Sequence, residues 1–140
     1  MRTPDGRFAV LGRFDAVVKV LGWAVSTTEV CQVVEDHPFV RWAEVLERPD
    51  ERRGHHLVVC LALAPGAIPD ERIAEEIRTH IHQTLGGIAR PRTVMFLDEF
   101  PTRCSPRELR EALRVLARDR HEPVIVLGAR DIQETLAQLA

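Results

Sequence analysis

The sequence predicts a small α+β domain, with helices packed on a three-stranded sheet and a β-hairpin near the N-terminus. Two observations lead to this fold class. Short apolar runs bounded by turn residues alternate with segments in which apolar residues recur every three or four positions. The chain has 140 residues, 45% of them hydrophobic and 29% charged, which is typical of one globular domain spanning residues 1–140.

The first third of the chain predicts a hairpin followed by a helix. The apolar runs at 8–11 and 17–20 are separated by turn-forming residues and predict the two hairpin strands. A Ser or Thr within 26–28 can cap a helix over 29–36. His37-Pro38 ends that helix, because the residue before a proline is disfavoured in the helical region.

Three further apolar runs predict the strands of the sheet. They lie at 40–46, 57–63 and 93–97, and the turn residues at 49–54 separate the first two. The run at 57–63 is apolar without interruption, which indicates a central strand that is buried on both faces.

Three more helices are predicted from their capping residues and apolar spacing. Pro69-Asp70-Glu71 begins the first, and Gly86-Gly87 closes it. Its core residues recur every four positions, at Ile73, Ile77, Ile81 and Leu85. Ser105-Pro106 begins the second, because a cap residue followed by proline is a common helix start. The third is predicted over Asp131 to Leu139.

Composition excludes several classes of function. The net charge of −2 gives no support for binding nucleic acid. No apolar stretch is long enough for a membrane helix or a signal peptide. We therefore expect a cytoplasmic protein. Cys31, Cys60 and Cys104 lie far apart and predict free thiols, not a disulfide framework or a zinc site. His80 and His82 point to different faces of a helix, so no metal site is predicted.

A series of motifs resembles the C-terminal domain of adenylate-forming enzymes, and is most similar to acetyl-CoA and propionyl-CoA synthetases. They occur in the family's order and at its spacing over roughly 130 residues. The matching positions are Asp5-Gly6-Arg7-Phe8, Gly12-Arg13, Asp15, Lys19, Gly22, Glu29, His37-Pro38, Pro49-Asp50, Gly54-His55, Leu85-Gly86, Ala89, Pro91 and Phe100 to Ser105.

The resemblance implies roles for individual residues. Asp15 falls on the hinge about which the small domain of these enzymes rotates between adenylation and thioester formation. Arg13 falls near the nucleotide, and Gly22 falls where the backbone approaches the pantetheine tunnel. His82 falls on an arginine that contacts the nucleotide of CoA in acetyl-CoA synthetases.

The departures from the family concern charged groups. The adenylation lysine is replaced by Arg107 and the glycine before it by Pro106, so the sequence predicts no catalytic residue. Ala24 replaces a phosphate-contacting arginine, and Cys31 replaces a glutamate. Around Arg107, we interpret Arg103, Arg110 and Arg114 as a basic strip on a solvated helix face.

Two hypotheses of function follow, and both predict no ATP-dependent ligation by this domain alone. The first is a non-catalytic binding or assembly module that docks onto a separate adenylation domain, a carrier protein or a second copy of itself, with Trp23 as anchor. The second is the small subunit of a split acyl-CoA synthetase that supports the thioester step. In either case CoA, AMP or ATP would bind only together with a partner domain. A fragment of a longer gene product is the remaining alternative.

Overall fold

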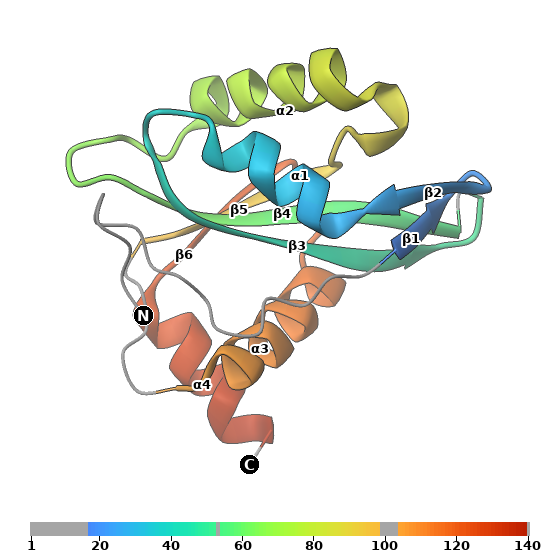
Figure 1. The fold of residues 1–140 in the computed structure, drawn as a ribbon. Coiled ribbons are helices and arrows are strands. Elements are labelled where there is room, and N and C mark those ends of the chain that lie inside the picture. Colours follow the sequence, from blue (N-terminus) through green and yellow to red (C-terminus); the bar gives the residue numbers. More distant parts are fainter. Residues whose placement is uncertain (1–16, 53, 99–103, 140) are drawn as a thin grey trace.

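The computed structural model describes residues 17–52, 54–98 and 104–139. At its centre is a mixed sheet of four strands in the order β3-β4-β5-β6, with β3 antiparallel to β4 and the other three parallel. Helices α1 and α2 cover one face, and α3 and α4 cover the other (Figure 1). The predicted α+β class is confirmed. The elements are β1 (Val17–Val20), β2 (Trp23–Ser26), α1 (Thr27–Glu35), β3 (Val40–Asp50), β4 (Gly54–Leu63), α2 (Glu71–Leu85), the 3-10 turn η1 (Gly87–Ala89), β5 (Thr93–Leu97), α3 (Pro106–Asp119), β6 (Val124–Leu127) and α4 (Ala129–Leu139).

The central strand β4 is apolar throughout because both of its faces are covered. Val59 and Leu61 belong to the core shared with α1 and α2. Val58 and Cys60 point the other way, into the core shared with α3. A strand that alternates between two apolar layers has no solvent-facing side to carry polar residues. The prediction of a central buried strand is therefore confirmed.

Capping residues set the beginnings of three helices, as predicted. Ser26 Oγ accepts a hydrogen bond from the Glu29 N–H at 3.3 Å and caps α1. Asp70 Oδ1 accepts from the Ile73 N–H at 3.1 Å and caps α2. Ser105 caps α3, with Pro106 as the first helical residue. No helix in the described ranges is long and apolar enough to cross a membrane.

The hairpin differs from the predicted one. Val17–Val20 pairs with Trp23–Ser26, and the run at 8–11 lies outside the described residues. The turn consists of Leu21 and Gly22, whose φ angles are +51° and +82°. Two successive residues with positive φ are typical of a tight two-residue hairpin turn, which twists in the same sense as the strands. The prediction missed this turn because Asn or Asp usually precedes the glycine, and leucine rarely does.

The sheet has one strand more than predicted. β6 is a four-residue strand at the edge, and Val94 in β5 is the register partner of its first residue, Val124. The Val94 N–H also donates to the Pro123 carbonyl at 2.9 Å. β3 is longer than predicted and continues to Asp50. Short edge strands give little signal in a sequence, since their register is fixed by the neighbouring strand.

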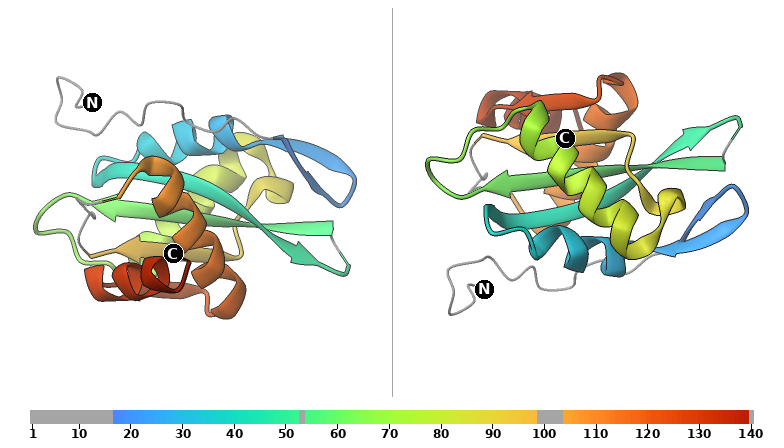
Figure 2. Two further views of the ribbon diagram at one scale, coloured as in Figure 1. Left: turned by 90° about the horizontal axis from the view of Figure 1, so that it is seen from below. Right: turned by 90° about the horizontal axis from the view of Figure 1, so that it is seen from above.

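The hairpin β1–β2 projects from the end of the sheet where β3 turns into β4, as both views in Figure 2 show. Gly54 at that turn has a φ of +83°, and a Cβ there would lie 3.3 Å from the Lys19 carbonyl oxygen. The His55 Nδ1 also lies 3.3 Å from the same oxygen. The strand β1 is therefore packed directly against the start of β4.

The strained turn gives a first prediction. Leu21→Asn should raise the free energy of unfolding by about 0.5–1 kcal/mol, because asparagine tolerates positive φ better than leucine does. Gly22→Ala should lower the free energy of unfolding by about 1 kcal/mol, because alanine tolerates positive φ less well than glycine does. Urea unfolding followed by circular dichroism measures both. Ile68→Asn, at an exposed loop position without positive φ, is the matched control and should give no gain.

Candidate functional site

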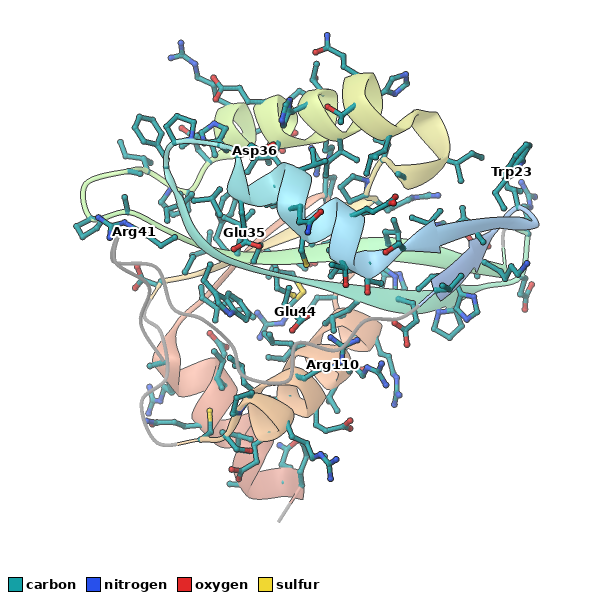
Figure 3. The ribbon with its side chains drawn as sticks, viewed as in Figure 1. Trp23, Glu35, Asp36, Arg41, Glu44 and Arg110 are labelled. Atoms are coloured by element: carbon teal, nitrogen blue, oxygen red, sulfur yellow. The ribbon has the colours of Figure 1, made fainter. Side chains whose placement is uncertain are left out.

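The tip of the hairpin exposes large apolar side chains. Val18 and Val20 point inward and are buried, which holds β1 against the core. Leu21 and Trp23 lie at the tip and are 50% and 67% exposed. Figure 3 shows Trp23 at one end of the molecule. A large aromatic side chain held in solvent by a rigid turn is a common feature of contact surfaces.

The first turn of α3 carries the position at which the resemblance places a lysine. Arg107 is the second residue of α3 and is exposed. The Glu108 N–H donates to Ser105 Oγ at 3.1 Å, and the Ser105 N–H donates to Glu108 Oε1 at 2.9 Å. The backbone hydrogen bond from Ser105 lowers the pKa of the Glu108 carboxyl. This reciprocal capping box fixes the backbone around Arg107.

The predicted basic strip on α3 is wrong for two of its members. Arg110 Nη1 lies 2.8 Å from Glu44 Oε1, and both side chains are only 6% exposed. Arg114 Nη2 lies 2.9 Å from Glu47 Oε1 in a partly buried pair. Figure 3 shows Glu44 and Arg110 facing each other between β3 and α3. Arg103 lies outside the described residues.

Arg48 holds the other end of α3. Its Nη1 donates to the carbonyl oxygens of Ala117 at 2.9 Å and Arg120 at 3.0 Å, which are groups left without partners at a helix C-terminus. Its Nη2 donates to Thr93 Oγ1 at 3.3 Å. Burial is the main cause of a lowered pKa for Arg48, and the positive charge of Arg92 lowers it further. Glu44, Glu47 and Arg48 of β3 thus each contact α3 or its C-terminal cap. We call this set of contacts the β3–α3 clamp.

The cysteines and histidines form no reactive or metal-binding cluster in the described ranges. Burial raises the pKa of the Cys60 thiol. Burial, followed by the charge of Glu108, also raises the pKa of Cys104, which makes its thiolate scarce. His80 Nε2 lies 3.9 Å from Asp36 Oδ2. His82 is exposed, with its ring beside Gly87.

Comparison with known proteins decides the family. The profile of the AMP-binding enzyme C-terminal domain matches residues 29–107, more than half of the chain. The chain belongs to this family. The acetyl-coenzyme A synthetase of Rubrobacter xylanophilus is 35% identical over 121 residues, which are 86% of this chain and 19% of that enzyme. The acetyl-coenzyme A synthetase of Mycobacterium tuberculosis is 37% identical over 117 residues, which are 84% of this chain and 18% of that enzyme.

A solved structure supports the same assignment. The acyl-CoA synthetase of Brucella canis is 31% identical and aligns with a TM-score of 0.60, covering 76% of this chain and 19% of that one. This AMP-binding enzyme C-terminal domain therefore spans about a fifth of the length of the relatives it matches. The resemblance stated from the motifs is confirmed.

The domain places its predicted site residues at opposite ends of the sheet. Gly22 lies in the exposed turn beside the start of β4, with no atom within 4 Å of where its Cβ would be. Arg107 lies beyond the end of β5, and β5 runs parallel to β4 (Figure 1). His82 is in the last turn of α2. Arg13 and Asp15, the nucleotide and hinge positions, lie outside the described residues.

The β3–α3 clamp was not predicted, although the sequence carries a signal for it. Trp42 and Leu46 point from β3 into the core under α3, so the strand's period of two also places Glu44 and Arg48 on that face. A carboxylate and a guanidinium at buried strand positions require partners of opposite charge or free carbonyl oxygens. Arg110 and Arg114 are four residues apart on α3 and could have been recognised as such partners.

The buried pair gives a second prediction. Glu44→Ala should destabilise the domain by about 3–5 kcal/mol, because it leaves the Arg110 charge buried without its partner. The double variant Glu44→Leu/Arg110→Met should be much more stable than Glu44→Ala, because no charge remains buried. Denaturant unfolding measures both.

A surface pair is the matched control for this experiment. Arg130 and Glu134 form an ion pair at 3.4 Å with side chains 91% and 66% exposed. Glu134→Ala should therefore cost at most about 0.5 kcal/mol. Similar losses for Glu44→Ala and Glu134→Ala would contradict a structural role for the buried pair.

Proposed function

We propose that this domain is a non-catalytic binding or assembly module that docks onto a separate adenylate-forming domain or a carrier protein. The single observation that carries the proposal is Arg107, which stands at the family's lysine position in the capped first turn of α3. A guanidinium is a planar fork of donors, whereas an ammonium is a compact point charge, so arginine does not replace a catalytic lysine.

The backbone before Arg107 supports the same proposal. Pro106 fixes φ at the first helical position, and the capping box between Ser105 and Glu108 closes the turn around it. A residue that delivers a charge to a distant active site needs a segment that can adjust its backbone. Here the segment has instead the features of a stable helix start.

The hairpin tip supplies the contact surface in this proposal. Leu21 and Trp23 are exposed apolar side chains at the tip of a hairpin whose strand β1 packs on β4. Aromatic residues of this kind often contribute much of the binding energy of an interface. A partner that covers the tip would remove apolar surface from water, and CoA, AMP or ATP would be held only when the partner completes their sites.

Co-elution tests this function. The chain is mixed with an acetyl-CoA synthetase truncated before its own C-terminal domain, and separately with an acyl carrier protein, and each mixture is run on a sizing column. We expect a complex with one of them, weakened about tenfold or more by Trp23→Ala. Val126→Ala is the matched control, because Val126 is an exposed apolar residue of β6, across the sheet from the hairpin. A chain that elutes unchanged in every mixture would contradict the module.

A second candidate function is the small subunit of a split acyl-CoA synthetase that supports thioester formation. The observation that favours it is the intact, unobstructed turn at Gly22, which lies far from the altered lysine position. Thioester formation is measured from acetyl-adenylate and CoA with the truncated synthetase, with and without this chain. An unchanged rate would exclude this candidate and leave the assembly module.

The same mixture tests the substitution at position 107. Pro106→Gly/Arg107→Lys should increase formation of acetyl-adenylate from acetate and ATP by about tenfold or more, because it restores a compact cation on an adaptable backbone. Arg118→Lys, an exposed substitution in the last turn of α3, is the control and should have no effect. Full adenylation activity with the unaltered chain would show that Arg107 is catalytically competent and would overturn the non-catalytic proposal.

A further inference from the structure

A small pocket lies beside the hairpin, between β2, the first turn of α1 and η1. Its volume is about 270 Å³. The walls include Trp23, Leu85 and Ile88, and the carboxylate-bearing Glu29 lies at the same pocket. This volume is below the roughly 300–1,000 Å³ that is usual for cofactor and drug-sized ligands. The size therefore suits a single side chain better than a nucleotide.

The charge at the pocket is negative. Among the described residues that line it, Glu29 alone carries a charge. Its side chain is exposed, and no ion pair joins it to Lys19 on the neighbouring strand within the described part of the chain. α1, β2 and η1 contain no lysine or arginine. Ala24, which also lines the pocket, has only a methyl group as its side chain.

We infer that this pocket receives an arginine side chain of the protein partner. The guanidinium would stack on the face of Trp23 and form a charge-assisted hydrogen bond with Glu29. The methylene stem would pack on Leu85 and Ile88, as the stems of long basic side chains commonly do on apolar surface. This inference rests on the proposed function for the statement that the partner is a protein.

The adenine ring of CoA could also stack on Trp23. The negative charges of CoA and of Glu29 argue against this occupant. CoA carries several negative phosphate charges, and the only charged group lining the pocket among the described residues is also negative. Like charges at short distance repel, whereas an arginine gains both from the carboxylate and from the indole face. The pocket therefore favours a cation.

Amide and indole NMR of the intact, isotope-labelled chain tests the inference, with N-acetyl-arginine amide as the probe. The chain has two tryptophans, and Trp42 is buried, so its indole signal is an internal reference for that of Trp23. We expect saturable shifts at the Trp23 indole and at the amides of Glu29 and Ala89. N-acetyl-citrulline amide has nearly the same shape without the charge and should bind at least about fivefold more weakly.

Two variants distinguish binding in the pocket from nonspecific electrostatic attraction of the probe to the protein surface. Glu29→Gln should weaken binding of the arginine probe about fivefold or more. Glu111→Gln removes an exposed carboxylate from α3, on the other face of the sheet, and should leave binding unchanged. Equal shifts with the citrulline probe, no effect of Glu29→Gln, or shifts of the Trp23 indole with CoA but not with the arginine probe would each overturn the inference.

These results are distinguishable from the outcome of co-elution. If the arginine probe fails to bind while the truncated synthetase or carrier protein still forms a complex, the pocket inference is wrong and the proposed function stands. If the probe binds as described and no complex forms with either partner, the proposed function is wrong and the pocket's preference for a cationic side chain stands.

Discussion

The buried ion pair between Glu44 and Arg110 is the constraint on which the packing of α3 depends. Neither charge is stable in an apolar layer without the other, so this pair allows α3 only one register along β3. Arg48 adds a second fixed point by donating to the carbonyl oxygens of Ala117 and Arg120 at the far end of the helix. With both ends held, the first turn of α3 occupies a defined position relative to the sheet.

With α3 in this position, two surfaces lie apart to which the family resemblance assigns different steps, thioester formation and adenylation. The turn at Gly22 extends from the end of the sheet where β4 begins, and Arg107 lies past the end of β5 (Figure 1). In the proposed module, the hairpin end retains an exposed aromatic anchor, whereas the α3 end has a capped helix with arginine at the altered lysine position.

Local signals predicted most of the fold, and long-range contacts account for what they missed. Ser26, Asp70 and Ser105-Pro106 each determine a helix start through hydrogen bonds to residues three positions away, so a sequence reveals them. The β1–β2 turn was missed because Leu21 adopts a positive φ that its side chain disfavours. The edge strand β6 is short and depends on β5 for its register. Arg110 was expected in solvent because its partner lies 66 positions earlier, on another element.

The most direct test of this account is titration of the isotope-labelled chain with AMP and with ATP, followed through the arginine side-chain signals of α3 in NMR spectra. The charges of Arg110 and Arg114 are already paired with the carboxylates of Glu44 and Glu47, so these two side chains attract a phosphate less than unpaired surface arginines would. The signals of Arg110 and Arg114 are therefore expected to stay unchanged up to nucleotide concentrations at which an exposed basic strip would bind. Saturable shifts of these two side chains would show that the β3–α3 clamp opens to nucleotide, and would contradict the account.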